Sequence, residues 1–216
     1  MTPFQPQVSA DHYVKAKYLT KDRWINYWYQ WHWLQQKNIT TLLEIGVGNR
    51  IVAELYERTG TKVTTVDIDA ALKPDQVASV TALPFGQNTF DAVLCAEVLE
   101  HLPFDQSLQG MREVYRVTRR WALITLPHAG YVFSIMTKFP LLRWCSWVRK
   151  IPFFWKEHVF LGEHYWELGK KGWNNQRIIS ALVTCGFAVR EVRMHADDPA
   201  HVFFLCEKIA AAKSDA

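Results

Sequence analysis

Two glycines and a carboxylate lie close together in the segment LLEIGVGNR, residues 42–50. Glu44, Gly46 and Gly48 follow a buried apolar run and precede the pattern of a helix. Glycines at the end of a strand let a ligand approach the backbone closely, and the first amides of the next helix are free to bind it. A carboxylate two residues before the first glycine suits a ligand with a positive ammonium group, because the two form charge-assisted hydrogen bonds.

The same segment departs from the fingerprint of dinucleotide-binding proteins. A G-x-G-x-x-G motif needs a small residue at position 51, where this chain has Ile51, so a pyrophosphate ligand is disfavoured. Asp67 ends the next β-branched run, VTTVDID, where a carboxylate can accept both hydroxyls of a ribose. These residues predict a nucleoside site. The alternative is that Asp67 and Asp69 cap a helix or form a turn.

The elements that must position these residues alternate between strand and helix. Apolar β-branched runs predict strands over 40–46, 62–69, 89–97 and 120–127, and helical periodicity predicts helices over 49–60 and 107–118. A helix over 174–186 is followed by two strands, 187–194 and 201–209, which read as an antiparallel pair. This order predicts an α/β fold with a parallel sheet and helices on both faces, in one domain over residues 1–216.

The amino-terminal part of this domain, residues 1–38, is rich in tryptophan. Thr20 can cap a helix that runs to about Lys37, because apolar residues recur at helical spacing at Trp24, Tyr27, Trp28, Trp31 and Leu34. The opposite side of this helix is apolar as well. Two interpretations remain open, a helix packed between the core and another apolar element, or a lid over the substrate.

A longer series of motifs runs through the sheet region in a fixed order: E-x-G-x-G, V-x-x-V-D, LPF, FDAV and EVLEHL. In order and spacing this series resembles the class I S-adenosylmethionine-dependent methyltransferases, specifically the type 11 methyltransferase family. The resemblance covers Thr41 to His128 closely and residues 174–208 in layout only. It implies S-adenosylmethionine as the cofactor and a Rossmann-like, mostly parallel sheet of seven strands whose last strand is antiparallel.

The resemblance also implies roles for individual residues, from the methionine part of the cofactor through its ribose and adenine to the methyl group. The residues expected to bind the cofactor are, in that order, Glu44, Gly46 and Gly48, then Asp67 and Ile68, then Thr81, Ala82 and Leu83, and finally Cys95, Ala96 and Glu97. Two departures stand out. Arg50 occupies a position where the family often has a third glycine, so it either stiffens the loop or reaches an acidic group. Ser79, Val80 and Thr81 stand where the family tends to have an aspartate.

Methyl transfer needs a base only when the acceptor is a hydroxyl or a protonated amine, because the sulfonium is already a good leaving group. The candidate catalytic bases are Glu97, His101 and His128, each at or just beyond the C-terminal end of a predicted strand. The alternative for Glu100 and His101 is that they only cap or orient the following helix. The chain lacks an N-P-P-Y-like tetrapeptide and a paired-cysteine motif, which disfavours adenine amines and pyrimidine carbons as acceptors.

Substrate choice is expected in the insertion 131–172, which follows the fifth strand. Residues 131–160 hold nine aromatic residues and five cations against Glu157 alone, a net charge of +4 that equals the surplus of the whole chain. This composition suits a membrane interface or a single-stranded nucleic acid. The third alternative is a helical cap packed on the Trp-rich amino-terminal helix. Within GEHYWELGKKGW, we expect either a substrate-binding loop or a rigid turn; the candidate substrate-binding residues are His164, Tyr165 and Trp166.

Composition narrows the remaining choices. The 216 residues are 49% hydrophobic and 21% charged, typical of a globular domain. The four cysteines lie far apart without a C-x-x-C pair, so no metal is expected and a reducing cytoplasm fits best. No signal peptide or membrane-crossing segment is predicted, because the most apolar window, 131–155, is interrupted by cations and prolines.

The sequence therefore predicts a cytoplasmic methyltransferase. Residues 131–160 are its candidate segment for membrane contact, as one of the alternatives given above. We expect its acceptor to be an oxygen or nitrogen atom of a small or amphiphilic metabolite, such as a sugar- or lipid-linked compound. The alternatives are a nucleic-acid methyltransferase and a catalytically silent protein that binds S-adenosylmethionine.

Overall fold

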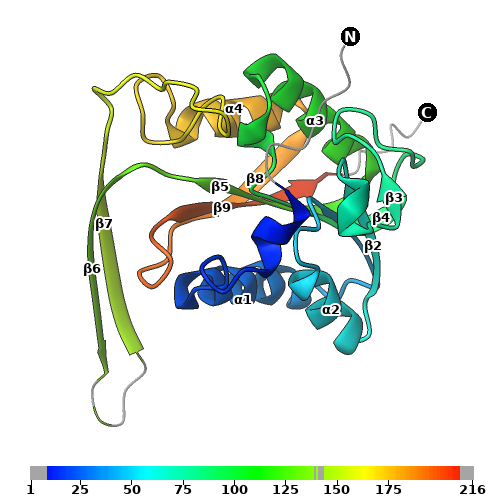
Figure 1. Ribbon diagram of the computed structural model, residues 1–216, viewed down its shortest axis with the longest axis horizontal. Helices are drawn as coiled ribbons and strands as arrows, with labels where there is room; N and C mark the ends of the chain where they lie inside the picture. Colours follow the sequence, from blue (N-terminus) through cyan, green and yellow to red (C-terminus); the bar gives the residue numbers. More distant parts are fainter. Residues whose placement is uncertain (1–8, 139, 141–143, 210–216) are drawn as a thin grey trace, which may run out of the picture.

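The computed structural model describes residues 9–138, 140 and 144–209 (Figure 1). Its centre is a seven-stranded sheet in the order β3-β2-β1-β4-β5-β9-β8. The sheet is parallel except for β9, which runs antiparallel to both β5 and β8. The predicted fold class is confirmed. The strands are β1 (Thr41–Ile45), β2 (Lys62–Asp67), β3 (Gln76–Val77), β4 (Phe90–Ala96), β5 (Thr118–Pro127), β8 (Phe187–Arg193) and β9 (His201–Lys208).

Helices cover both faces of the sheet (Figure 1). In β1, Leu42 packs in the cluster beneath α1 and α2, whereas Leu43 and Ile45 pack in the cluster beneath α3 and α4. This alternation follows from the pleat, because successive side chains of a strand point to opposite faces. It also places Glu44 on the α1–α2 side. The helices are α1 (Lys21–Gln35), α2 (Ile51–Arg58), α3 (Phe104–Val117) and α4 (Asn175–Thr184), with short 3-10 turns η1 (Ala10–Val14), η2 (Ala70–Leu72) and η3 (Leu99–His101).

The Trp-rich helix α1 begins where the sequence predicts. The Thr20 hydroxyl accepts a hydrogen bond from the Arg23 amide at 3.4 Å, which caps the helix. Trp33 and Leu34 are buried against the sheet, while Trp24 remains about half exposed. Of the two interpretations, the helix packed on the core is the one the structure supports. None of the helices in the described residues is long and apolar enough to cross a membrane.

The insertion after β5 differs from one expectation. It forms a two-stranded antiparallel hairpin, β6 (Gly130–Lys138) and β7 (Trp144–Pro152), which stands apart from the helices (Figure 1). The expected helical cap on α1 is therefore wrong. The segment is rich in β-branched and aromatic residues, which favour a pleated strand over a helix. Of the aromatic residues counted above, Tyr131, Phe133, Trp144 and Trp147 lie on this hairpin, and others lie in the loop that follows it.

The loop after the hairpin returns to the core through Trp166. This side chain is almost fully buried, stacks on Trp173 at 5.3 Å between ring centroids, and packs edge-on against Phe104 of α3. Its indole N–H donates to the Leu102 carbonyl and to the Ser107 hydroxyl, each at 3.1 Å. Trp166 therefore anchors residues 153–173 and is closed off from solvent, which is a correction to its expected role in substrate binding.

Replacing Trp166 with alanine should lower the free energy of unfolding by about 3–5 kcal/mol, because a large buried side chain and its two hydrogen bonds are lost. Tyr165, the exposed neighbour, is the matched control, and its replacement by alanine should cost less than about 1 kcal/mol. Urea unfolding followed by circular dichroism measures both. Equal losses for the two variants would show that Trp166 does not anchor the loop.

Candidate cofactor-binding and active site

A cleft opens where β1, β2 and β4 end, at the edge of the sheet where open α/β folds bind their ligands. Seven of the residues predicted to contact the cofactor line this cleft: Glu44, Gly46, Gly48, Asp67, Ile68, Ala96 and Glu97. His101 from η3 lines it as well.

The two glycines leave the cleft open at the end of β1. Gly46 has a φ of +82°, and a Cβ atom there would lie 2.4 Å from Cγ2 of Val98. Gly48, with a φ of +50°, lies under the ring of Tyr13. Only glycine adopts such backbone angles freely, so the loop keeps its shape and its close approach to a ligand only with these residues.

Glu44 is a buried carboxylate that lacks a full set of partners. Its side chain lies on the cleft wall, and its Oε2 atom has no hydrogen-bond partner among the described residues. Burial raises the pKa of Glu44 to about 8, although the Arg50 charge and the Ala53 amide oppose this shift. An orphaned buried oxygen beside the glycine loop fits a ligand that brings a hydrogen-bond-donating cation.

Arg50 occupies the position of the third glycine and adopts the backbone conformation that a glycine would have there. The residue has a φ of +66°, the left-handed conformation that glycine adopts most easily. Its guanidinium donates to Glu57 at 3.0 Å and to the Thr65 hydroxyl at 3.2 Å. The prediction that Arg50 reaches an acidic group is confirmed, and these contacts hold a backbone conformation that is otherwise unfavourable for arginine.

Asp67 ends β2 at the cleft, and Asp69 begins η2. The Asp67 carboxylate accepts a hydrogen bond from the Asp69 amide at 2.9 Å, while Asp69 accepts from the Ala71 amide at 2.9 Å. Burial raises the pKa of Asp67 above its usual value, against the effect of the surrounding backbone amides. Asp69 is therefore the residue that caps η2. The ribose role of Asp67 stays a prediction.

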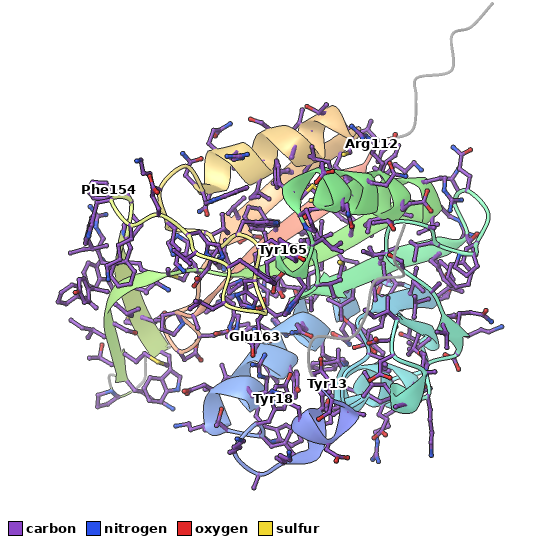
Figure 2. The ribbon with its side chains drawn as sticks, turned by 45° about the horizontal axis from the view of Figure 1, so that its top comes forward. Tyr13, Tyr18, Arg112, Phe154, Glu163 and Tyr165 are labelled. Carbon is purple, nitrogen blue, oxygen red and sulfur yellow. The ribbon has the colours of Figure 1, made fainter. Side chains whose placement is uncertain are left out.

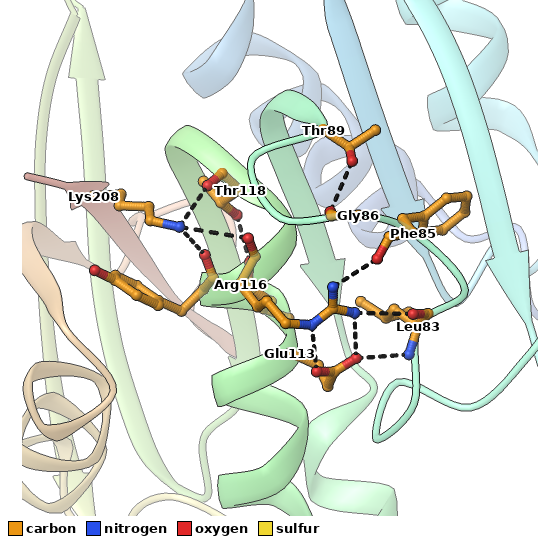
Figure 3. A network of polar contacts seen from close by, with 10 residues as sticks. Leu83, Phe85, Gly86, Thr89, Glu113, Arg116, Thr118 and Lys208 are labelled. Atoms are coloured by element: carbon orange, nitrogen blue, oxygen red, sulfur yellow. Dashed lines mark hydrogen bonds and ion pairs between the residues drawn. The ribbon is translucent and has the colours of Figure 1, made fainter. Parts of the chain in front are cut away.

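The residues that line the cleft at the expected adenine position lie three positions earlier in the chain than predicted. Ala78, Ser79 and Val80 line the cleft, whereas Thr81, Ala82 and Leu83 are not among its lining residues. Figure 3 shows why. The Leu83 amide donates to Glu113 of α3 at 2.8 Å, and the Arg116 guanidinium donates to the carbonyls of Leu83 and Phe85. The LPF motif is thus fastened to α3, and the residues before it face the cleft.

Cys95 also differs from its prediction. The side chain is fully buried in the cluster beneath α3 and α4, and burial raises the pKa of its thiol. It is not one of the residues lining the cleft, because its neighbour Ala96 points there instead.

Glu97 lines the cleft and has a φ of +54°, just after β4. The Thr125 hydroxyl donates to its Oε1 at 3.1 Å, and Nε2 of His201 lies 3.7 Å from its Oε2. His201 in turn bonds Asp198 through Nδ1 at 2.6 Å. Burial opposes a charge on the His201 ring, but the Glu97 and Asp198 carboxylates outweigh it and raise the pKa of His201.

The network behind Glu97 extends into α1. The Asn26 amide donates to Asp198 at 2.8 Å, and the Gln30 amide donates to Asn26. Sequence reasoning missed His201 and Asp198. The segment between the last two predicted strands, ADDPA, has the composition of a turn, so its sequence gives no signal for a site.

The three candidate histidines lie in different surroundings. His101 lines the cleft, and its ring lies 4.8 Å from that of His164 between centroids. Burial and His164 lower the pKa of His101 to about 4, so its ring is neutral at neutral pH. His128 is not among the lining residues, because its ring faces the Ala129 carbonyl and packs against Gly169. The structure therefore places His128 outside the lining of the cleft, and its role as a catalytic base stays a prediction.

One group of possible metal ligands lies beside the cleft. Side-chain ligand atoms of Glu100, His101 and His164 lie within 4.8 Å of one another. Burial first, and then the Glu97 charge, hold the pKa of Glu100 well above its usual value. Burial thus disfavours the charged form of Glu100 at this position.

Two tyrosines from the amino-terminal segment cover the glycine loop. Tyr13 and Tyr18 line the cleft, with ring centroids 5.3 Å apart, and burial raises the pKa of Tyr13 to about 12. Figure 2 shows them below Glu163 and Tyr165, which belong to the loop after the hairpin. The Tyr165 ring stacks on Phe160, and neither Tyr165 nor His164 is among the lining residues. Tyr13 and Tyr18 were missed because a polar segment precedes α1.

Comparisons with known proteins agree with this geometry. Residues 43–125 match the model of a methyltransferase domain family. A ubiquinone biosynthesis O-methyltransferase of Serratia proteamaculans is 36% identical over 115 residues, which cover 45% of this chain and 43% of that protein. The chain thus matches less than half the length of this relative.

Solved structures share the fold at low sequence identity. The 1,6-didemethyltoxoflavin-N1-methyltransferase of Burkholderia thailandensis, solved with 1,6-didemethyltoxoflavin and S-adenosylhomocysteine, has a TM-score of 0.60 and 13% identity, covering 96% of this chain and 94% of its own. The N-methyltransferase NodS of Bradyrhizobium japonicum, solved with S-adenosylhomocysteine, has a TM-score of 0.63 and 10% identity, covering 93% and 96%.

Fold, cleft and domain match agree with one another. Residues 43–125 match a methyltransferase domain, and the sheet around them has the fold of solved methyltransferases. S-adenosylmethionine is the cofactor that the glycine loop and the buried carboxylates of this domain fit.

Replacing Asp67 with alanine should weaken binding of S-adenosylhomocysteine by about 1–3 kcal/mol, because two charge-assisted hydrogen bonds to the ribose are lost. Asp105, an exposed carboxylate on α3 outside the cleft, is the control, and Asp105→Ala should leave the affinity unchanged. Calorimetric titration measures both. Unchanged affinity in Asp67→Ala would place the ribose elsewhere.

The raised pKa of Glu44 predicts proton release on binding. In the free protein the carboxyl holds a proton below about pH 8, whereas a bound ammonium group favours the carboxylate. Binding of S-adenosylhomocysteine at neutral pH should therefore release a proton, and affinity should increase as the pH rises toward that value. Calorimetry in buffers of different ionisation enthalpy counts the proton.

The Glu44→Gln variant should bind S-adenosylhomocysteine more weakly and release no proton from this site. Glu54→Gln, on the exposed side of α2, is the matched control and should behave like the unchanged protein. If the unchanged protein released no proton, Glu44 would not contact the ammonium group.

Proposed function

We propose that this protein transfers the methyl group of S-adenosylmethionine to an oxygen or nitrogen atom of a small or amphiphilic metabolite. The observation that carries the proposal is Glu97, which lines the cleft and whose two carboxylate oxygens face Thr125 and His201. The named relatives support this range of acceptors, since they include an O-methyltransferase and N-methyltransferases.

The charge of the cleft supports a positively charged cofactor. Four acidic side chains line it, Glu44, Asp67, Asp69 and Glu97, against Arg23 as the cation among its lining residues, and Glu44 adds its charge when an ammonium group binds beside it. A cleft with this balance attracts a ligand that bears an ammonium and a sulfonium group. When bound, the cofactor supplies an electrophilic methyl group on a good leaving group.

The residues of the chain then have two tasks, to align the acceptor and to take its proton. Glu97 is placed to accept a proton from an O–H or N–H group as the new bond to carbon forms. Thr125 and His201 hold the carboxylate in one orientation, and Asp198 fixes the His201 ring through Nδ1. His101, neutral and on the cleft wall, is the second candidate base.

Aromatic side chains favour an acceptor with apolar area. Tyr13, Tyr18 and Tyr27 line the cleft beside the polar groups. The relative from ubiquinone biosynthesis is named as an O-methyltransferase, which supports an oxygen atom as one acceptor. An acceptor that combines a nucleophilic oxygen or nitrogen with an apolar body satisfies both surfaces.

The test is formation of S-adenosylhomocysteine with a panel of catechols, phenols, amines and lipid-linked sugars. At least one acceptor should give turnover, and Glu97→Gln should lower its rate by about 10²–10⁴-fold, because the base is lost, while the affinity for S-adenosylhomocysteine is retained. Glu54→Gln is the control and should keep full activity.

Two outcomes would contradict the proposal. Tight binding of S-adenosylhomocysteine with no turnover on any acceptor would identify a silent binding protein. Full activity in Glu97→Gln would remove Glu97 from the reaction.

A further inference from the structure

The β6–β7 hairpin exposes side chains along its whole length. Every residue of β6 after Gly130 is exposed, and so are six of the nine residues of β7. Figure 1 shows the hairpin at one side of the molecule, apart from the helices. Neither strand belongs to the central sheet. An arm of this kind buries little of its own apolar surface, so its surface composition needs a physical reason.

The register divides the hairpin into two faces, because directly opposed residues of an antiparallel pair share a face. Ser134 and Lys150 belong to the inner face. The Ser134 hydroxyl donates to the Ala196 carbonyl, and the Lys150 ammonium donates to the carbonyls of Pro199 and His128. The inner face is therefore the one that contacts the body of the protein, at the loop between β8 and β9.

The other side of the hairpin carries five large apolar side chains, which we call the outer face. Opposed pairs place Tyr131 beside Ile151 and Ile135 beside Trp147, with Phe133 between them in the same row. All five are exposed by 43–59%. Such a continuous apolar row marks an interaction site.

The outer face continues into the loop that follows β7. The Tyr131 ring contacts Phe153 at 4.9 Å between centroids, Phe153 contacts Trp155 at 5.8 Å, and Trp155 contacts Phe154 at 4.9 Å. Phe154 is 65% exposed, and Figure 2 shows it at the edge of the molecule. The chain of rings therefore extends the apolar surface beyond the hairpin.

The charge around these rings has one sign. Residues 131–156 contain five Lys or Arg residues and no Asp or Glu. Arg149 lies on the outer face opposite Phe133, and the Lys156 ammonium lies 4.3 Å from the centre of the Phe153 ring. Two copies of this face placed together would bring like charges into contact. The complementary partner is an apolar surface with negative charge.

We propose that the outer face docks on an anionic lipid bilayer. Tyr131, Phe133 and Trp147 insert at the level of the headgroups, where aromatic side chains are favoured, and Arg149 and Lys156 contact lipid phosphates. The hairpin begins three residues after β5 ends, at the edge of the sheet that holds the cleft. The inference goes beyond methyl transfer and does not depend on it.

The experiment is flotation of the whole chain with vesicles of phosphatidylcholine alone and of phosphatidylcholine mixed with phosphatidylglycerol. The protein should float with the anionic vesicles and stay unbound with the neutral ones, and added salt should release it, because exposed charges are screened. Trp147→Ser should weaken vesicle binding about tenfold, since one large apolar contact is lost. Arg149→Gln should weaken it as well.

Two matched controls separate this surface from general effects. Trp28→Ser removes a tryptophan of similar exposure on α1, and Arg112→Gln removes an exposed cation on α3, far from Phe154 in Figure 2. Both should bind vesicles like the unchanged protein. Titration with S-adenosylhomocysteine checks that all variants are folded, and it reports on the cofactor site independently of the hairpin.

Three results would overturn the proposal. The first is equal binding to neutral and anionic vesicles, and the second is equal loss in Trp147→Ser and Trp28→Ser. The third is a protein that ignores vesicles but dimerises through the hairpin, shown by a monomeric Trp147→Ser variant in sedimentation velocity.

Discussion

The buried carboxylate of Asp198 joins the parts of the molecule that make the site. It is 1% exposed, and it bonds Asn26 of α1 with one oxygen and His201 of β9 with the other. A buried carboxylate is costly unless its oxygens are bonded, so the positions of α1 and β9 are fixed relative to each other. His201 then faces Glu97 on the lining of the cleft.

Two further residues that shape the site lie after the ends of β4 and β1. Glu97 and Arg50 both hold left-handed backbone conformations, and each is retained by side-chain contacts, to Thr125 and His201 in one case and to Glu57 and Thr65 in the other. Strain of this kind persists only where the surroundings determine it strongly. The two positions flank the cleft, where a fixed geometry serves alignment of a cofactor and an acceptor.

The sequence was sufficient for the fold and for one half of the site. Motifs that end β1, β2 and β4 are local, so Glu44, Gly46, Asp67 and Glu97 could be assigned to one edge of the sheet by strand order alone. His201 could not be found in this way, because it lies far along the chain from Glu97 and meets it only through the antiparallel return of β9. The residues predicted to border the adenine do not line the cleft, because the LPF motif is hydrogen-bonded to Glu113 and Arg116 of α3. No local sequence pattern reveals this contact.

The central claim is that this cleft binds an adenosine-containing sulfur cofactor through buried carboxylates rather than a dinucleotide through a pyrophosphate loop. Parallel calorimetric titrations of the whole chain with S-adenosylhomocysteine and with NAD test it most directly. The account predicts saturable binding of S-adenosylhomocysteine at one site and no binding of NAD. Binding of NAD alone would contradict it.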